Sequence, residues 1–237
     1  MAPERLLHPF VVVDIALFAM DGDALKVLLV RRSEEPEIRR WALPGGALRP
    51  EVDDDLEAAA LRVLREKVGV EIGHLEEVRS FSGRDRDPRD WSVSMLYFAL
   101  LPKDRLKPLL RSKVEAVEWV DPAAPGRRMA FDHAQQLEVA LARLREKVER
   151  HALPLHLLPG QFTLTELQRT CEAILGRPLD KSVFRRRLKG MDDLVELPGQ
   201  YERGQQRPAQ LYAAREGFEC WRRPKIDPPV RVMPLQI

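Results

Sequence analysis

The chain has 237 residues, of which 44% are hydrophobic and 32% are charged. This composition supplies enough apolar material for a core and excludes a chain that is disordered throughout. The formal net charge of +2 conceals an asymmetry, since residues 1–150 hold 25 Lys and Arg against 27 Asp and Glu, whereas residues 151–237 hold 14 against 10. The basic excess lies in the C-terminal third, which is typical of contact with a polyanion.

No stretch reaches the ~18 consecutive apolar residues of a membrane span. The apolar segment Phe10–Met20 contains Asp14 and has no small-residue cleavage site, so we do not expect a signal peptide. The two cysteines, Cys171 and Cys220, lack the spacing of a metal site or a disulfide framework. These features predict a cytoplasmic protein without a membrane segment or a structural metal.

The first 150 residues combine β-rich segments with only two long helical patterns. Apolar residues recur every fourth position from Asp54 to Val68, which predicts a helix that Gly69 ends. A second helix is predicted over Ala130–Arg150. The predicted strands are Phe10–Phe18, Leu25–Arg32, Val70–Ser80, Trp91–Leu101 and Val114–Val120. Two helices are too few for repeated βαβ units, so the pattern favours an α/β sandwich over residues 1–150.

A second unit is predicted over residues 162–217, after a linker at residues 151–161 that contains two prolines and a glycine. Thr163 and Glu166 have the spacing of a capping box, and the helix that they begin ends at Gly176. Asp180 can cap a second helix. Two short strands follow at Leu194–Leu197 and Ala209–Ala213. This order is typical of a winged helix-turn-helix, and residues 218–237 form a Pro-rich tail.

Residues 45–70 resemble the Nudix box, whose usual pattern is G-x5-E-x7-R-E-U-x-E-E-x-G-U, where U is apolar. The matching residues are Gly46, Arg62, Leu64, Glu66, Gly69 and Val70, and Asp54 stands where a glutamate is usual. The resemblance implies a Nudix-type α/β/α sandwich. However, Val63 and Lys67 replace two of the glutamates that hold divalent cations against a pyrophosphate.

These replacements predict a protein with no catalytic residues and no metal site, because Asp54 and Glu66 could at best hold one ion weakly. The competing interpretation is an active pyrophosphohydrolase of ADP-ribose or a related dinucleotide, which would need a further carboxylate outside the box. We expect Lys67 to lie on a solvated helix face.

A Nudix pocket without catalysis can still bind a nucleotide. Glycine amides can bind phosphate, arginines can bind it in bidentate fashion, and tryptophans can flank a base. The predicted effector-binding residues are Trp41, Gly45, Gly46, Arg49, Glu66, Arg84, Arg89 and Trp91. The loop at residues 84–91 contains three arginines and is called the arginine-rich loop. It could instead be a solvated turn with internal ion pairs, and we expect His133 to be structural.

The second helix of the C-terminal unit carries a run of basic residues. Phe184 and Leu188 must face a small core, which leaves the basic side chains on the opposite side for a major groove. Arginines in the following hairpin suit a minor groove or a phosphate. The predicted DNA-binding residues are Thr163, Thr165, Lys181, Ser182, Arg185, Arg186, Lys189, Arg203, Arg207 and Gln210. The alternative is a solvated helix face.

The two units together resemble the Nudix-related transcriptional regulators of NAD metabolism, the NrtR family. The resemblance rests on the degraded Nudix box, on Ala130-Phe-Asp-His133, on Phe162–Gln168, on Phe184–Arg187 and on Arg207–Tyr212. It implies a homodimeric bacterial repressor of NAD biosynthesis or salvage genes. Such a repressor would bind a palindromic operator and an ADP-ribose-type effector, and would require no cofactor. An RNA-binding accessory protein is a further alternative, although we expect no exposed aromatic side chain in the arginine-containing wing for stacking on single-stranded bases.

Overall fold

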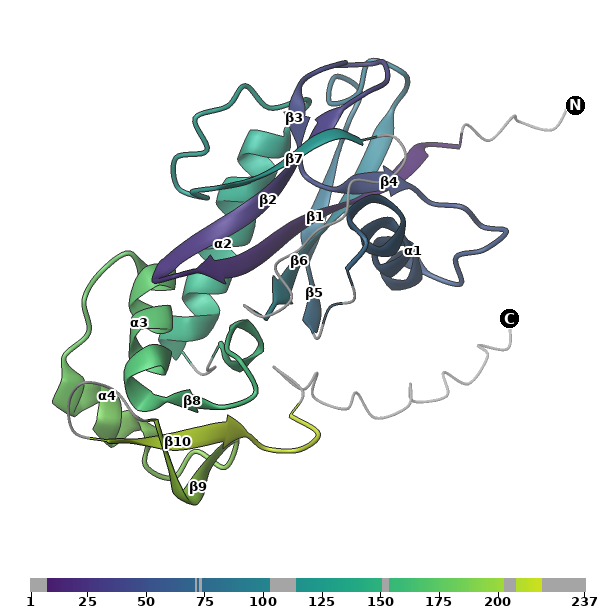
Figure 1. Ribbon diagram of the computed structural model, residues 1–237. Helices are drawn as coiled ribbons and strands as arrows, with labels where there is room; N and C mark the ends of the chain where they lie inside the picture. The colour runs from purple at the N-terminus through teal and green to yellow at the C-terminus, as the bar shows by residue number, and fades with distance from the viewer. Residues whose placement is uncertain are drawn as a thin grey trace, which may run out of the picture.

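The computed structural model describes residues 8–70, 72, 74–102, 114–150, 154–202 and 208–218. Its larger part is built on one seven-stranded mixed sheet in the order β3-β2-β1-β6-β5, with β4 paired to β1 and β7 paired to β2 (Figure 1). The strands are β1 (Phe10–Asp21), β2 (Ala24–Arg32), β3 (Trp41–Ala42), β4 (Gly45–Ala47), β5 (His74–Gly83), β6 (Ser92–Leu101) and β7 (Val114–Val120). β1 and β6 run parallel, whereas β1 pairs antiparallel with β2.

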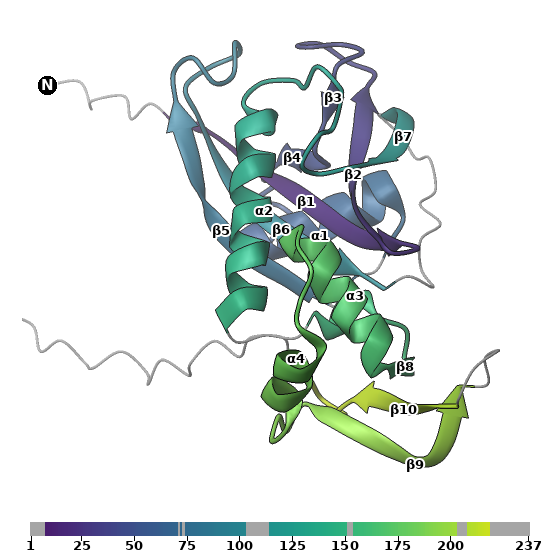
Figure 2. The same ribbon diagram turned by 90° about the vertical axis from the view of Figure 1, so that its left-hand side faces the viewer.

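The central strand β1 is apolar on both faces because helices cover both faces of the sheet. Phe18 and Met20 belong to the core cluster on one face, whereas Ile15 and Leu17 belong to the cluster on the other. The first face carries α2 (His133–Arg150), and the second carries α1 (Leu56–Val63) with the π-helical segment η1 (Leu64–Val68) (Figures 1 and 2). The α/β/α sandwich predicted from the sequence is therefore confirmed.

Some boundaries differ from the prediction. The first helix begins at Leu56 rather than at Asp54, because Asp55 is its N-cap and accepts a hydrogen bond from the backbone N–H of Ala58. Strands β3 and β4 lie between the predicted strand Leu25–Arg32 and the first helix, where the sequence analysis predicted no strand. Both are two or three residues long, which is too short for a periodic pattern to reveal.

The smaller part is a winged helix, as predicted. Its elements are η3 (Leu155–Leu157), β8 (Phe162–Thr163), α3 (Leu164–Leu175), α4 (Lys181–Leu188), β9 (Leu194–Glu202) and β10 (Ala209–Ala214). The capping box at the start of α3 is present, and Gly176 ends the helix in a left-handed conformation. β9 continues through Pro198, beyond the predicted end at Leu197, because β9 lies at the edge of the β8-β10-β9 sheet where a missing N–H is tolerated.

The described part of the predicted linker is not a loose spacer. Leu155, Leu157 and Leu158 are buried in the same core cluster that contains side chains of α2, α3 and α4. At the far end of α2, Arg145 Nε donates to the Ile174 carbonyl oxygen of α3 at 2.9 Å, and Glu149 forms an ion pair with Arg177 at 2.9 Å. The winged helix is thus packed against α2 and beside β2 (Figure 2).

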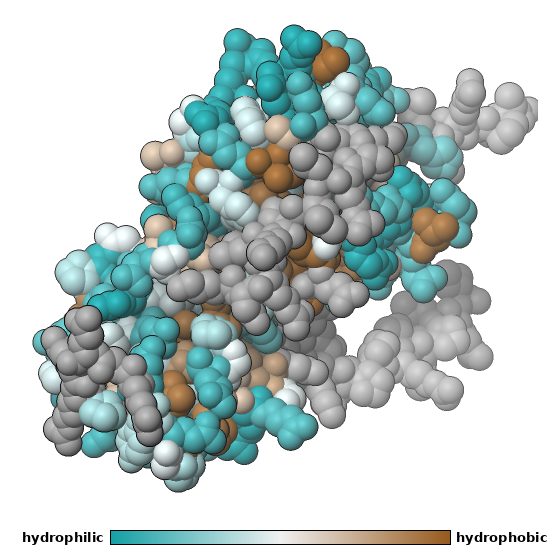
Figure 3. Space-filling model, in the orientation of Figure 1, coloured by the Kyte–Doolittle hydropathy of each residue, from teal (hydrophilic) through white to brown (hydrophobic). Residues whose placement is uncertain are grey.

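On the face seen in Figure 3, hydrophilic side chains cover most of the described surface and the hydrophobic patches are small and separate. Among the described residues, no helix is long and apolar enough to cross a membrane. Cys171 is buried in α3, and burial raises the pKa of its thiol to about 12. The predicted wing residues Arg203 and Arg207, together with Cys220 and residues 219–237 of the tail, lie outside the described residues.

Candidate effector cavity and nucleic-acid interface

A cavity of about 320 Å³ opens beside β1, β2 and β4, next to the Nudix box. Its wall is rich in charge of both signs. Six cationic residues line it: Arg32, Arg49, Arg62, Lys67, Arg86 and Arg89. Five acidic residues line it: Asp14, Glu34, Glu35, Glu66 and Asp87.

Arg62 holds the loop of the Nudix box against the helix. Its side chain is buried, and its Nε and Nη2 donate to the two carboxylate oxygens of Asp53 at 2.7 and 2.8 Å. Nη2 also donates to the Ala47 carbonyl oxygen at 2.9 Å, and Asp53 accepts a further bond from the Arg49 backbone N–H at 2.8 Å. The Arg62 hydrogen bond lowers the pKa of Asp53 to about 2. Asp53 is thus the carboxylate that binds Arg62, whereas its neighbour Asp54 is exposed.

Glu66 and Lys67, the adjacent residues of the box, both face the cavity. Glu66 Oε1 accepts from Arg49 at 3.0 Å, and its Oε2 accepts from Arg62 at 3.4 Å. Lys67 Nζ donates to the Gly45 carbonyl oxygen. The expectation that Lys67 lies on a solvated face is therefore wrong. One turn of π-helix at residues 64–68 carries both side chains.

Close contacts explain both glycines of the box. A Cβ atom on Gly45 would lie 2.1 Å from Asp14 Oδ1, and one on Gly46 would lie 2.9 Å from Val63 Cγ2. Any side chain at these positions would collide with a buried carboxylate or with α1. The two glycines therefore allow β4, which lines the cavity, to pack closely against β1 and α1.

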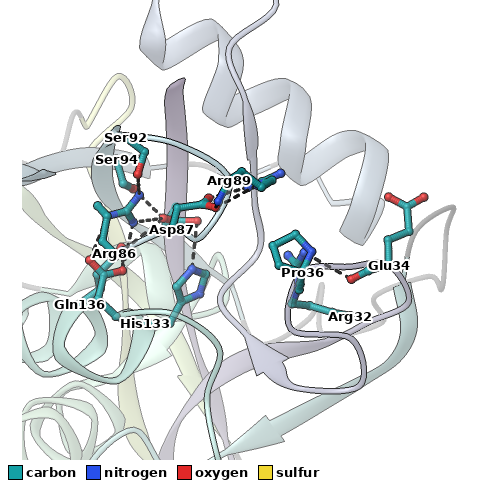
Figure 4. Close-up of polar contacts among 12 residues, drawn as sticks. Arg32, Glu34, Pro36, Arg86, Asp87, Arg89, Ser92, Ser94, His133 and Gln136 are labelled. Atoms are coloured by element: carbon teal, nitrogen blue, oxygen red, sulfur yellow. Dashed lines mark hydrogen bonds and ion pairs between the residues drawn. The ribbon is translucent and has the colours of Figure 1, made fainter. Parts of the chain in front are cut away.

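A buried polar network forms the inner wall of the cavity (Figure 4). Arg86 Nε and Nη2 donate to the two carboxylate oxygens of Asp132, each at 3.0 Å, and Nη1 donates to Ser92 Oγ at 3.0 Å. Asp14 accepts from Ser94 Oγ at 2.6 Å and from Gln136 Nε2 at 3.2 Å, and it lies 3.7 Å from Arg86 Nη2.

His133 belongs to the same wall. It is buried, and its Nδ1 accepts a hydrogen bond from the Leu43 backbone N–H at 2.9 Å. Its Nε2 lies 3.6 Å from Asp14 Oδ1. Burial lowers the pKa of His133 despite this carboxylate, so the ring holds the start of α2 against the sheet in its neutral form.

The outer wall contains Arg89 and Arg32. Arg89 donates to both carboxylate oxygens of Asp87, at 3.0 and 2.6 Å, and its guanidinium lies 4.5 Å from the Phe10 ring centroid. Arg32 Nε donates to the Pro36 carbonyl oxygen at 2.9 Å (Figure 4). Burial, followed by the neighbouring charge of Arg89, lowers the pKa of Arg32. An anion bound in the cavity would reduce the electrostatic repulsion between these two guanidinium groups.

Five of the predicted effector residues line this cavity: Gly45, Gly46, Arg49, Glu66 and Arg89. The other three do not line it. Trp41 packs against the core on the α2 side of the sheet. Arg84 is exposed, and Trp91 is 41% exposed at the far end of the arginine-rich loop.

Four cations that line the cavity were not among the predicted effector residues: Arg32, Arg62, Lys67 and Arg86. Arg86 had a visible signal, because it lies in the loop that carries three arginines, but spacing alone did not show which arginine turns inward. Arg32 ends a predicted strand and carried no signal.

The candidate nucleic-acid interface is the outer face of α4. Lys181, Ser182, Arg185, Arg186 and Lys189 are all exposed, whereas Phe184 and Leu188 are buried in the core, as the periodicity predicted. Asp180 caps the helix by accepting from the Val183 backbone N–H at 2.8 Å, and it also accepts from Ser182 Oγ at 2.6 Å.

The three remaining described residues of the predicted DNA-binding set differ in exposure. Thr163 is buried and its hydroxyl is bonded to Glu166 within the capping box, so it is not available to DNA. Thr165 is exposed. Gln210 is half-buried, and its amide donates to the Gln200 carbonyl oxygen at 3.0 Å within the hairpin. Thr163 and Gln210 therefore serve the local fold, which explains why hydrogen-bonding residues stand there.

Family comparisons agree with the two-part architecture. The Nudix domain family matches residues 8–144, and the NrtR DNA-binding winged helix domain matches residues 154–214. The fold and these matches define a Nudix-fold domain joined to a DNA-binding winged helix domain. The ADPR-responsive transcriptional repressor NtrR of Acinetobacter baylyi is 44% identical over 205 residues, which are 86% of this chain and 81% of that protein. The chain belongs to the NrtR family.

Solved structures show the same relationship. Shewanella oneidensis NrtR in complex with a 27mer DNA superposes with a TM-score of 0.78 at 37% identity, covering 86% of this chain and 93% of that one. The Nudix domain of the same protein, complexed with ADP-ribose, superposes with a TM-score of 0.56 at 35% identity, covering 61% of this chain and 94% of that one. An ADP-ribose pyrophosphatase of Methanocaldococcus jannaschii is 34% identical over 95 residues, which are 38% of this chain and 50% of that protein.

Proposed function

We propose that this protein is a transcriptional repressor whose DNA binding is weakened by ADP-ribose or a related nucleotide. It acts as a homodimer on a palindromic operator of NAD biosynthesis or salvage genes, in the cytoplasm. The observation that carries the proposal is the presence, on one chain, of a cation-lined Nudix cavity and an exposed basic helix in a winged helix. The relatives that are named as a repressor and as complexes with DNA and with ADP-ribose support it.

The chemistry of the cavity suits a pyrophosphate. Arg89 lies close enough to Arg32 to disfavour the charge of Arg32, and Arg49 and Lys67 face the same space. Guanidinium groups bind phosphate oxygens in bidentate fashion, with greater geometric specificity than an ammonium. The cavity volume of about 320 Å³ lies within the range of small-molecule sites. We infer that Arg49 and Arg89 contact the phosphates, while Gly45 and Gly46 let them approach the backbone.

The same residues fit a divalent cation poorly. A hard cation requires several oxygen ligands, and an ammonium supplies none. Each oxygen of Glu66 already accepts from an arginine, Lys67 stands beside it, and Asp54 is exposed. No group of three or more His, Cys, Asp or Glu within the described ranges could hold a metal ion. We therefore propose a sensor without hydrolase activity, although the likeness to a pyrophosphatase keeps hydrolysis as the alternative to test.

For DNA, we propose that Arg185 and Arg186 read base edges while Lys181 and Lys189 contact phosphates. A helix in the major groove presents its exposed face to the bases, and arginine is the commonest partner of guanine. The sequence argument against RNA binding was wrong in one respect, because Tyr201 of β9 is an exposed aromatic side chain in the wing. RNA binding therefore stays the alternative, and the proposal for duplex DNA rests on the exposed basic face of α4.

The test is selection of duplexes from a random DNA library, followed by fluorescence anisotropy with and without ADP-ribose. We expect an enriched inverted repeat and a loss of affinity within the usual 5–150-fold range of allosteric coupling. Failure to enrich any duplex, or an affinity that saturating ADP-ribose leaves unchanged, would refute the proposal.

A further inference from the structure

Arg86 is the one arginine of the loop at residues 84–89 whose side chain is turned inward. Its side chain is 8% exposed, whereas that of Arg89 is 45% exposed and Arg84 is exposed as a residue. It nevertheless lines the effector cavity, and it also lines a second cavity of about 470 Å³. A ligand in either space would therefore meet this guanidinium.

The partner of Arg86 is the residue just before α2. Arg86 donates two N–H groups to the two carboxylate oxygens of Asp132, each at 3.0 Å, so the pair is bidentate. The Asp132 side chain is 19% exposed. Burial raises the pKa of Asp132, but the hydrogen bonds from Arg86 and Gln136 outweigh this and leave it lowered. The ion pair thus ties the wall of the cavity to the start of a helix.

The backbone at this junction is strained. Phe131, which precedes Asp132, has a φ of 50°, a left-handed conformation that a bulky side chain rarely adopts. Its ring lies 4.9 Å from the guanidinium of Arg32, another lining residue of the cavity. The segment is therefore held in place by contacts with the cavity wall rather than by its own preference.

α2 connects this junction to the winged helix. Its 18 residues span roughly 27 Å at 1.5 Å per residue. At its far end, Arg145 bonds the Ile174 carbonyl oxygen of α3, and Glu149 is paired with Arg177. A shift of the first turn of α2 would therefore reach α3 and α4 through a rigid element and direct contacts.

We propose that the Arg86–Asp132 ion pair is the switch through which an anionic ligand in the cavity controls the position of α2 and hence of the winged helix. The inference rests on the proposed function and deepens it. Phosphate oxygens compete with the Asp132 carboxylate for the same guanidinium N–H groups. When the ligand takes Arg86, Asp132 is released, and the strained turn at Phe131 rearranges. Without ligand, the pair holds α2 in the arrangement that binds DNA.

This mechanism makes an unusual prediction for Asp132→Asn. The variant loses the charge that competes with the ligand, so ADP-ribose should bind several-fold more tightly than to the unaltered protein. The same change should weaken ligand-free DNA binding, although Asp132 lies in the Nudix domain. The response to ligand should fall from at least about fivefold to less than about twofold, because the two states are no longer separated by this pair.

The experiment measures three quantities for the full chain: the Kd of ADP-ribose by calorimetry, the Kd of a selected duplex, and the ratio of duplex Kd with and without ADP-ribose. Asp90→Asn is the matched control, since it removes the same charge from an exposed residue that follows Arg89 and lines neither cavity, and it should leave all three unchanged. Arg86→Lys is a second variant, because lysine keeps the charge but cannot form the bidentate pair. It should also reduce the ratio. Thermal unfolding confirms that each variant is folded.

A residue that only stabilises the fold would not tighten ligand binding when removed. If Asp132→Asn leaves the ratio at its unaltered value, or weakens ADP-ribose binding, the switch is refuted while the proposed function stands. The proposed function fails in a different way: the unaltered chain would then have the same duplex Kd with and without ADP-ribose.

Discussion

The ion pair between Asp53 and Arg62 should contribute more to stability than any other contact of the Nudix box. In Asp53→Asn, Arg62 remains buried and charged without its carboxylate. Removing one partner of a buried pair typically costs about 3–5 kcal/mol. The lower end is expected here, because Glu66 Oε2 remains 3.4 Å from Arg62. For a chain of this size, about 3 kcal/mol corresponds to a fall of roughly 6–12 °C in Tm.

The assay is thermal and urea unfolding, with Asp54→Asn as the matched control. Asp54 is exposed and should change stability by less than about 0.5 kcal/mol. The pH dependence gives a second readout. The pKa of Asp53 is lowered to about 2 in the folded protein, whereas it is near 4 in the unfolded chain. Its contribution to the free energy of unfolding is therefore fully present above about pH 4 and is lost as the pH falls through about 2. Equal losses for the two variants, or an unchanged acid limb in Asp53→Asn, would refute this reasoning.

Two further predictions concern the two functions. The purified protein should not turn over ADP-ribose or NADH above background with magnesium or manganese, and a rate of ~1 per second or more, by chromatography of the products, would contradict the sensor assignment. In α4, Arg185→Ala or Arg186→Ala should cost ~1–3 kcal/mol of DNA-binding free energy and relax the sequence preference. Lys181→Ala should weaken the binding of all DNA sequences alike and reduce the slope of log affinity against log salt concentration by about one. If none of the three variants changes DNA affinity in a fluorescence titration, α4 is only a solvated helix face.

Sequence reasoning was most successful where the pattern is local. The capping box at Thr163, the left-handed glycine that ends α3, and the buried pair Phe184 and Leu188 follow from spacing alone, and the structure contains all of them. Local rules fix these features because the interacting residues are at most four positions apart.

The effector site was predicted less well because its contacts are distant in sequence. Asp14, Arg86 and Asp132 meet only after β1, the arginine-rich loop and α2 have packed together. Spacing in a run of three aspartates also does not reveal that Asp53, and not Asp54, forms the ion pair with the buried Arg62. Trp41 was expected in the site from its type, yet its face of β3 turns it into the core.

Reciprocal linkage between the two ligands is the sharpest test of whether the nucleotide site and the DNA site of this chain are coupled. If ADP-ribose raises the Kd of the selected duplex by a given factor, then saturating duplex must raise the Kd of ADP-ribose by the same factor. We predict a factor between about 5 and 150, equal in the two titrations within error. A factor of one in both titrations, with each ligand binding on its own, would show that the two domains of this chain bind their ligands independently.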